Sequence, residues 1–280
     1  MKLGINLEYI RHADKPFEYG IREGHKIGYR YLEPCVSTGY DFLALGGFYH
    51  MLSMEEDPTE IKALCDSVGV KIEGVSGHSC LMAPDTGVHY LRRAIQWASD
   101  VGATIVNTDD GIRPIGMDDE TAMTMIRYTL TKSVRTAERY GITIALEDHQ
   151  VFTQDVDNFN KIMNMVDSAN LKINYDTGNA YIYGNDPVDF LRALGPERVV
   201  HLHAKDISTE MSQAQRGKVT GVPVGCACGE GVVDWKTVLT ILRDAGFKGV
   251  ISVECSNLEE AGRSYDYMTK LLSDLGVDYE

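Results

Sequence analysis

Four residues of types that bind divalent cations each stand at the carboxyl end of a short apolar segment in the second half of the chain. They are Glu147, Asp176, His203 and Glu254. Three carboxylates and one imidazole suit a hard divalent cation. If the four segments are parallel strands of a barrel, their carboxyl ends meet at one mouth and the four side chains form one site. The spacing therefore predicts a metal centre, provided that the fold is such a barrel.

Each of these residues also has an ordinary explanation. A single Glu at the end of a strand is more often exposed or salt-bridged than bound to a metal. Carboxylates are rare inside apolar runs, however, because burying an unpaired charge is costly. Here an ionisable residue recurs at the end of four successive apolar segments. This recurrence favours the metal site over four separate coincidences.

The elements that must position these residues alternate between helix and strand. Helix-periodic segments end at a Gly or Asn that can adopt the left-handed C-cap conformation, and a strand-like segment follows at once. These junctions are Gly28-Tyr29, Gly69-Val70, Gly102-Ala103, Gly141-Ile142, Asn170-Leu171 and Gly246-Phe247. With the first segment and the one after Gly195-Pro196, they predict eight strands, at about residues 2–7, 29–34, 70–77, 103–109, 142–148, 171–177, 199–205 and 249–255. Eight helices are expected between them.

Strict alternation of strand and helix predicts right-handed crossovers and a parallel sheet. No Gly-x-Gly-x-x-Gly follows the first strand to bind a dinucleotide, so an open doubly wound sheet is disfavoured. We therefore predict an α/β fold, a (β/α)8 TIM barrel, and a single domain over residues 1–280 because no linker divides the chain. The longest irregular stretch, Ile207 to Val233, is expected to lie over the barrel mouth as a lid or specificity loop.

The composition excludes several classes of protein. With 44% hydrophobic and 24% charged residues the chain is typical of a globular protein, and no apolar stretch approaches the roughly 20 residues that span a bilayer. A formal net charge of −14 repels phosphate backbones, so we expect no nucleic-acid partner. The chain begins with a strand-like segment rather than a signal peptide, which favours a cytoplasmic protein with its six cysteines reduced.

Three residues of the seventh strand carry separate expectations. His201 and His203 are expected to point to opposite sides of the sheet, so that only one of them faces the metal. We choose His203 because it is nearer the carboxyl end, and His201 is then a core histidine. Lys205 is expected on the same side as His203, where it either contacts the substrate or is a solvated lysine.

Other residues that follow strands are weaker candidates. Glu33 after strand two, His78 after strand three and residues 107–109 after strand four can contact substrate hydroxyls, although each also fits a capping or turn role. Trp235 is expected to pack rather than to line the site. Cys226 and Cys228 are too few for a zinc site and are expected to be structural.

Several motifs resemble those of the xylose-isomerase-like barrel superfamily, and the resemblance covers essentially the whole chain. The motifs are Leu-Glu147-Asp-His149, Asp176-Thr-Gly178-Asn179, His201-Leu-His203-Ala-Lys205-Asp206, Gly229-Glu-Gly231 with Asp234-Trp235, and Val-Glu254. Within the superfamily the chain looks most like sugar isomerases and epimerases related to the ketose 3-epimerases and to inosose dehydratase and isomerase.

The resemblance implies a metal on Glu147, Asp176, His203 and Glu254, with the two Glu residues also serving as acid and base. It implies manganese first, with magnesium or cobalt as alternatives. His149, Asn179, Lys205, Glu33 and His78 are the expected substrate-binding residues. Many relatives carry His where this chain has Asn179, and an amide can donate a hydrogen bond but cannot titrate near neutral pH.

Three functions remain open at this point. The first is a metal-dependent isomerase or epimerase that transfers a proton next to the carbonyl of a keto-sugar or polyol ketone, through an enediolate. The second is a lyase, either a dehydratase of an inosose-like ketone or an enzyme that cleaves a 3-keto glycoside. The third, less favoured, is a DNA-repair endonuclease, against which the acidic charge argues, as does the presence of only one four-ligand set rather than the larger cluster that a trinuclear site needs. We also expect a homo-oligomer, by analogy with other barrels.

Overall fold

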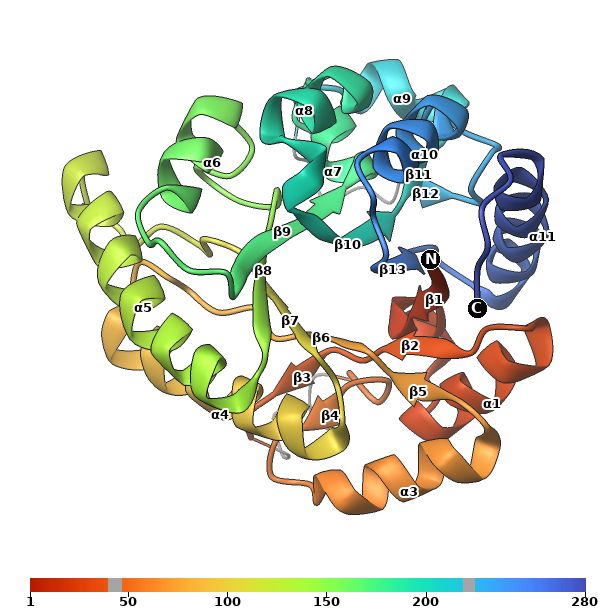
Figure 1. The fold of residues 1–280 in the computed structure, drawn as a ribbon, viewed down its shortest axis with the longest axis horizontal. Helices are drawn as coiled ribbons and strands as arrows, with labels where there is room; N and C mark the ends of the chain where they lie inside the picture. Colours follow the sequence, from red (N-terminus) through yellow and green to blue (C-terminus); the bar gives the residue numbers. More distant parts are fainter. Residues whose placement is uncertain (40–46, 219–224) are drawn as a thin grey trace.

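A ring of parallel strands encloses the centre of the protein in the computed structural model, which describes residues 1–39, 47–218 and 225–280 (Figure 1). The order of strands in this sheet is β5-β2-β1-β13-β10-β9-β8-β7-β6. The strands are β1 (Lys2–Asn6), β2 (Tyr31–Glu33), β5 (Lys71–Ile72), β6 (Gly74–Ser76), β7 (Ile105–Thr108), β8 (Thr143–Glu147), β9 (Leu171–Asp176), β10 (Val199–Ala204) and β13 (Val250–Val253). The predicted TIM barrel is therefore confirmed.

The third predicted strand is divided, and this division closes the ring. We expected one strand over residues 70–77, but Glu73 separates β5 from β6. The first piece, β5, pairs with β2, whereas the second piece, β6, pairs with β7. The two ends of the sheet therefore lie in one short stretch of chain, and Cys35 adds a further bridge from the β2 side to Ser76.

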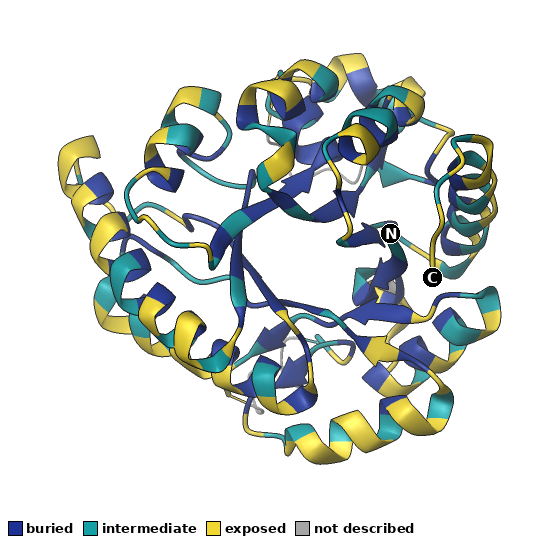
Figure 2. Cartoon of the chain, viewed as in Figure 1, coloured by how far each residue is buried: buried dark blue, intermediate teal, exposed yellow. Residues whose placement is uncertain are grey.

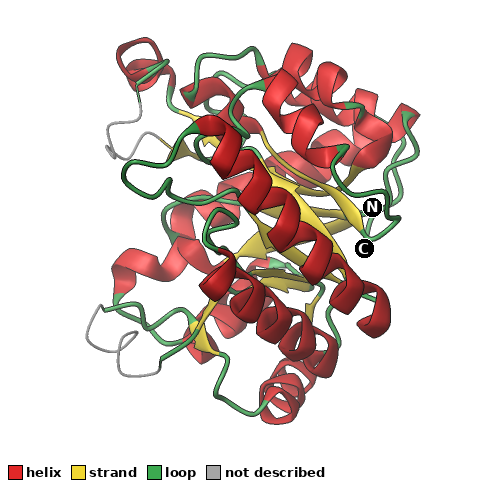
Figure 3. Ribbon diagram, turned by 90° about the vertical axis from the view of Figure 1, so that its left-hand side faces the viewer, coloured by secondary structure: helices red, strands yellow, loops and turns green. Residues whose placement is uncertain are grey.

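Helices surround the strands, as the side view in Figure 3 shows. The helices that cover the barrel are α1 (Phe17–Ile27), α3 (Pro58–Val68), α4 (Pro84–Val101), α5 (Asp119–Tyr140), α6 (Val156–Met163), α8 (Pro187–Leu194), α10 (Trp235–Asp244) and α11 (Leu258–Asp274). Shorter elements are η1 (Leu7–Ala13), η2 (Pro196–Arg198), α7 (Thr177–Ile182) and α9 (Thr209–Gln215). In the described part of the chain, no helix combines the length and the apolar character needed to cross a membrane.

Most of the helix caps that the sequence predicts are found in the structure. Asp57 caps α3 by accepting a hydrogen bond from the backbone of Thr59, with Pro58 in the first turn, and Asp118 caps α5 in the same way. The five Gly residues of the predicted junctions have positive φ angles, but Asn170 does not. Its side chain instead donates a hydrogen bond of 2.7 Å to the carbonyl of Ile142, so the Asn170 cap prediction is wrong.

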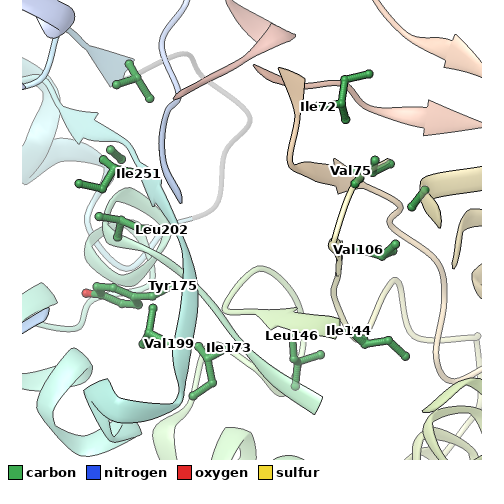
Figure 4. Close-up of a cluster of buried hydrophobic side chains, with 14 of the residues drawn as sticks. Ile72, Val75, Val106, Ile144, Leu146, Ile173, Tyr175, Val199, Leu202 and Ile251 are labelled. Atoms are coloured by element: carbon green, nitrogen blue, oxygen red, sulfur yellow. The ribbon is translucent and has the colours of Figure 1, made fainter. Parts of the chain in front are cut away.

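The strands place polar groups inside the ring and apolar groups against the helices. Tyr175 points outward, because its hydroxyl donates to the carbonyl of Pro187 and its ring stacks on Phe190 of α8. Asn174, one residue earlier, contacts His201 from the neighbouring strand. Figure 2 shows that buried residues concentrate on the strands and exposed residues on the outer faces of the helices. The buried apolar residues drawn in Figure 4 come largely from these strands.

Two small sheets, each of two strands, are formed by segments that follow β2 and β10 in the sequence. In one, β3 (Val36–Ser37) pairs with β4 (Leu52–Ser53), and in the other β11 (Asp206–Ile207) pairs with β12 (Gly225–Cys226). The stretch from Ile207 to Val233, which we expected to be irregular, thus contains part of β11, the helix α9 and β12. Residues 219–224 of this predicted lid lie outside the described residues.

Candidate metal centre

The four predicted metal ligands come together around one nitrogen atom of His203. Nδ1 of His203 lies 3.3 Å from Glu147 Oε2, 3.5 Å from Glu254 Oε2 and 3.9 Å from Asp176 Oδ2. Their strands β8, β9, β10 and β13 are consecutive in the sheet order. Ligands about 2.0–2.2 Å from one cation are about 3 Å apart from each other, which is close to the spacing seen here. The donor set of three carboxylates and one imidazole therefore fits a divalent cation.

Burial of several carboxylates together creates a need for positive charge. Burial raises the pKa of Asp176 to about 6, with Glu254 and Glu147 adding to the shift against the opposing effect of Lys205. Burial also acts to raise the pKa of Glu147, but the neighbouring His203 outweighs it and brings this pKa to about 2. Glu147 is therefore ionised at neutral pH, and a cation at the centre would offset the clustered negative charge.

Lys205 supplies one positive charge from within the chain. Its Nζ lies 2.5 Å from Glu254 Oε1 and 3.3 Å from Asp176 Oδ2. Burial acts to lower the pKa of Lys205, but the two carboxylates outweigh burial and the net shift is upward. The predicted substrate-contact residue therefore lies directly beside two of the predicted metal ligands.

Glu33 is buried against the second ring nitrogen of His203. Its Oε1 is 2.9 Å from His203 Nε2, and it also accepts hydrogen bonds of 2.6 Å from Ser76 Oγ and Asn107 Nδ2. Only 1% of its surface is exposed. A carboxylate on the second nitrogen of a metal-binding histidine fixes the tautomer and ring orientation. This placement suits a role in orienting His203, and not the substrate contact that we expected.

The expectation that His201 points away from the barrel axis is wrong. His201 Nδ1 lies 3.0 Å from Asn174 Oδ1, and its Nε2 lies 3.4 Å from Glu33 Oε2. Successive residues of a strand alternate, so residues two apart share a face, and His201 points inward with His203. Burial lowers the pKa of His201 to about 4, so this imidazole is neutral at physiological pH.

Asn179 contacts the centre through its amide. Its Nδ2 donates a hydrogen bond of 3.1 Å to Glu147 Oε1, and its backbone N–H donates one of 2.8 Å to Asp176 Oδ1. The second bond exists because Asp176 both ends β9 and caps α7. The residue that departs from the pattern of many relatives is thus in direct contact with two predicted ligands.

Two further residues of the centre were not singled out from the sequence. Asn174 Nδ2 donates a hydrogen bond of 3.0 Å to Glu147 Oε2, and Asp148 accepts one of 2.7 Å from the backbone N–H of Asp176. Asn174 stands two positions before Asp176, so strand parity alone would have placed it on the same face. Asp148 adjoins Glu147 but is completely buried, and burial raises its pKa well above the ordinary value. No local sequence pattern predicts the hydrogen bond between the backbone of Asp176 and the carboxylate of Asp148.

A second group of ionisable side chains lies next to Glu147. His149 Nδ1 is 2.5 Å from Asp109 Oδ2, and His78 Nδ1 is 3.5 Å from the same oxygen. His78 Nε2 lies 3.7 Å from Glu147 Oε2. The expected substrate residues His78 and His149 are therefore brought together, with Asp109 between them. His78, Asp109 and His149 form a further group of metal-binding residue types, but with three residues it is not a second four-ligand set.

Asp206 holds the loop that follows β12. Its carboxylate accepts hydrogen bonds from the backbones of Gly229, Gly231 and Val233 and from Trp235 Nε1. A Cβ atom at Gly231 would lie 2.1 Å from Asp206 Oδ1, so this approach requires glycine. Trp235 is buried, as expected for a packing residue. Cys226 and Cys228 are free thiols.

The sequence matches a family model described as a xylose isomerase-like TIM barrel over residues 21–271. An uncharacterized protein of Methanocaldococcus jannaschii is 28% identical over 193 residues, which cover 66% of this chain and 62% of that protein. The inosose dehydratase of Clostridium beijerinckii is 28% identical over 148 residues, which cover 50% of this chain and 49% of that protein. The chain thus spans about half to 62% of the length of these curated relatives.

Solved structures show the same fold. A crystal structure of a D-tagatose 3-epimerase-like protein superposes with a TM-score of 0.78 at 22% identity, covering 99% of this chain and 98% of that one. A crystal structure of the IOLI protein with a bound zinc atom superposes with a TM-score of 0.75 at 18% identity, covering 98% and 99% of the two chains.

Proposed function

The chain belongs to the xylose isomerase-like TIM barrel family, and we propose that it is a divalent-metal-dependent isomerase or epimerase of a keto-sugar or polyol ketone. One observation carries the proposal. Glu147 and Glu254, from strands separated by β9 and β10 in the sheet, approach the same nitrogen of His203 to 3.3 and 3.5 Å. Two carboxylates around one polarising centre suit the removal and return of a proton on a carbon next to a carbonyl.

The proposed metal ligands are Glu147, Asp176, His203 and Glu254. Manganese is expected first, because oxygen-rich sites with one imidazole suit it, and magnesium or cobalt fit the same donors. The bound ion would act as a Lewis acid on the substrate's carbonyl oxygen. Support for a divalent ion comes from the donor set of this chain and from the zinc atom of the IOLI structure.

The proposed base is Glu147, and its surroundings suit that role. Asn174 and Asn179 each donate a hydrogen bond to one of its oxygens, which holds the carboxylate in a single orientation. A bound cation would keep the carboxylate ionised, which is the form that can accept a proton from carbon. For epimerisation, Glu254 in its carboxylic acid form would then give a proton to the opposite face of the same carbon, and for isomerisation Glu147 would return its proton to the neighbouring carbon from the same face.

Lys205 and Asn179 are the proposed polar contacts of the substrate. The ammonium of Lys205 lies between Asp176 and Glu254, and the amide of Asn179 reaches Glu147. Both groups can donate hydrogen bonds to hydroxyl or carbonyl oxygens. We propose a free ketone as substrate, because no Gly-rich loop or cluster of basic residues stands at a strand end of the sequence to bind phosphate.

A lyase of the same scaffold is the second candidate. The first step would be the same proton removal by Glu147, followed by loss of a hydroxyl group from the next carbon. Such a departure requires a proton or a positive charge at the leaving oxygen. His78 lies 3.7 Å from Glu147 and His149 contacts Asp109 beside it, so these two side chains are the proposed source of either. The similarity to inosose dehydratase supports this alternative.

An endonuclease remains the least favoured function. The second cluster at His78, Asp109 and His149 weakens the argument that the chain has too few ligands for a multinuclear site. The net charge of −14 still opposes close approach of a phosphate backbone. We therefore propose a small-molecule substrate.

The test is proton exchange followed by NMR. The magnesium-loaded protein is incubated in D2O with a panel of ketoses, inososes and 3-keto glycosides, because magnesium avoids paramagnetic broadening. Deuterium next to the carbonyl, with all hydroxyl groups retained, is the result expected for an isomerase or epimerase. Loss of water or of an aglycone would instead establish the lyase, and absence of exchange on every ketone would reject both.

A further inference from the structure

Asp110 is a completely buried carboxylate that joins the loop after β7 to the loop after β8. Its Oδ2 accepts a hydrogen bond of 2.7 Å from the backbone N–H of Phe152, and its Oδ1 accepts one of 2.9 Å from the hydroxyl of Thr153. Strands β7 and β8 pair with each other in the ring, so the two loops leave the sheet from neighbouring positions. Asp110 is not among the proposed metal ligands, and its carboxylate serves to hold the second loop.

Thr153 connects this carboxylate to the backbone of His149. The Thr153 hydroxyl accepts hydrogen bonds of 3.1 Å from the backbone N–H of His149 and of 3.2 Å from that of Gln150. A hydroxyl has one hydrogen to donate and two lone pairs that accept. Its hydrogen is donated to Asp110, so both lone pairs are available to the two N–H groups. The carbonyl of His149 in turn accepts a hydrogen bond from the Tyr183 hydroxyl, so its backbone is held on both sides.

The side chain of His149 lies beside the proposed base. Its Nδ1 is 2.5 Å from Asp109 Oδ2. Its ring centroid is 5.5 Å from that of His78, whose Nε2 lies 3.7 Å from Glu147 Oε2. The conformation of the loop after β8 therefore decides whether this imidazole stands next to Glu147.

We propose that Asp110 is a positioning residue of the reaction, which holds the imidazole of His149 in place through the hydroxyl of Thr153. The proposal rests on the proposed function, because His149 can affect proton transfer only if the ketone binds beside Glu147. Asp110 itself touches neither the substrate nor the cation. It acts by fixing the backbone from which the His149 side chain reaches Asp109.

The need for two acceptor oxygens explains why a carboxylate occupies this buried position. Burial raises the pKa of Asp110 to about 6, although the hydrogen bonds from Phe152 and Thr153 act to lower it. The ionised carboxylate is therefore costly to bury, and its charge does not add to stability at neutral pH. An asparagine could accept only one of the two bonds, and its NH₂ group would compete with His149 and Gln150 for the Thr153 oxygen.

Substitutions at both ends of the contact between Asp110 and Thr153 test the proposal in the full-length protein. Asp110→Asn removes one acceptor, Thr153→Val removes the hydroxyl at nearly constant shape, and Thr153→Ser keeps the hydroxyl. Thr129→Val is the matched control, because Thr129 is also completely buried and donates its hydroxyl to the carbonyl of Leu81. Each protein is loaded with Mn²⁺, and kcat and KM are measured on the ketone that the D2O screen identifies. The value of kcat is expressed per bound Mn²⁺ ion, so that unfolded chains do not count.

We expect Asp110→Asn and Thr153→Val to lower kcat by about 10–100-fold with a smaller change in KM, because a shift of about 1 Å in a reacting group costs this much. Thr153→Ser and Thr129→Val should keep the kcat of the unaltered protein. If Asp110→Asn does not fold by circular dichroism, the two Thr153 variants carry the test. Full kcat in Thr153→Val, or an equal loss in Thr153→Ser, would overturn the proposal.

Amide hydrogen exchange followed by mass spectrometry tests the hydrogen-bond chain without a substrate. Exchange of residues 149–153 should be faster in Thr153→Val than in the unaltered protein, and unchanged in Thr129→Val. Unchanged exchange in Thr153→Val would overturn the proposal and leave the proposed function intact. Failure of the proposed function would appear differently, as absence of proton exchange by the unaltered protein on every ketone.

Discussion

Nε2 of His203 lies 2.9 Å from Oε1 of Glu33, although the two residues are 170 positions apart in the sequence. The other ring nitrogen of His203 faces the three carboxylates of the candidate metal centre. A proton on Nε2, shared with Glu33, leaves Nδ1 free to bind a cation. Glu33 would thus determine which nitrogen of His203 is presented to a bound cation.

Glu33→Gln should weaken metal binding while leaving the fold intact. The amide cannot hold the Nε2 proton of His203 as a carboxylate does, so we expect the affinity for Mn²⁺ to fall about 10–100-fold. Isothermal titration calorimetry measures this change. Glu73→Gln is a matched control, because Glu73 pairs with Lys2 at a partly exposed position away from the metal centre. Unchanged Mn²⁺ affinity in Glu33→Gln would show that Glu33 does not orient the histidine.

Glu147→Gln should abolish proton exchange even when enough metal is added to fill the site. Glutamine keeps an oxygen that can face the cation but cannot accept a proton from carbon, so we expect the rate to fall by about 10²–10⁴. Deuterium incorporation measured by NMR, with the metal content determined on the same sample, tests the prediction. The exposed Glu138→Gln serves as the control, since Glu138 accepts a hydrogen bond from Ser168 on the outer surface. Full exchange by Glu147→Gln with metal bound would exclude Glu147 as the base.

Lys205→Met should destabilise the metal-free protein more than the metal-loaded protein. Without metal, the ammonium of Lys205 contacts both Glu254 and Asp176, so its loss removes a positive charge from these carboxylates. We expect a loss of about 1–3 kcal/mol in unfolding free energy, because the pair is partly buried. Added Mn²⁺ should recover most of this loss, because a divalent cation supplies the missing charge.

Urea unfolding with and without Mn²⁺ measures both effects of Lys205→Met. Lys270→Met removes an exposed pair with Asp274 and should change stability by less than about 1 kcal/mol in either condition. An equal loss for Lys205→Met in the presence and absence of metal would contradict the role of Lys205 as a substitute for the cation.

Glu8→Gln should lower stability at neutral pH but not in acid. Glu8 contacts His50 and Arg11. Burial acts to raise the pKa of Glu8, but the hydrogen bond from His50 and the positive charges outweigh it, so the net shift is downward from 4.5. A carboxylate with a lowered pKa in the folded state contributes stability above its ordinary pKa, and this contribution disappears as the pH falls through the folded value.

We expect Glu8→Gln to cost about 0.5–1 kcal/mol at pH 7, a modest value because Glu8 is partly exposed. The difference from the unaltered protein should stay constant down to about pH 4.5 and shrink below it. Urea unfolding at a series of pH values measures it, with Glu18→Gln, which loses only an exposed pair with Arg22, as the control. A difference that grows on acidification would reverse the predicted sign.

The sequence by itself determined the order of the elements and the ends of most strands. Left-handed conformations at Gly69, Gly102 and Gly141 and the cap at Asp57 depend on a few neighbouring residues, so local patterns predict them. Local sequence patterns also predicted that Glu147 and Asp176 lie at the ends of their strands. The alternation of side chains along a strand also places His201 on the same face as His203. The expectation that the two histidines point to opposite sides did not follow from this alternation.

Only the tertiary structure decided which of these groups meet. The contact of Glu33 with His203, the pairing of Asp109 with His149 and the division of the third strand at Glu73 all depend on how the ring closes. Ring closure depends on the tilt and stagger of all the strands together, and no short segment specifies them. Local periodicity therefore assigns a side chain to a face of its strand, whereas closure of the barrel determines which side chains from distant strands lie within reach of one cation.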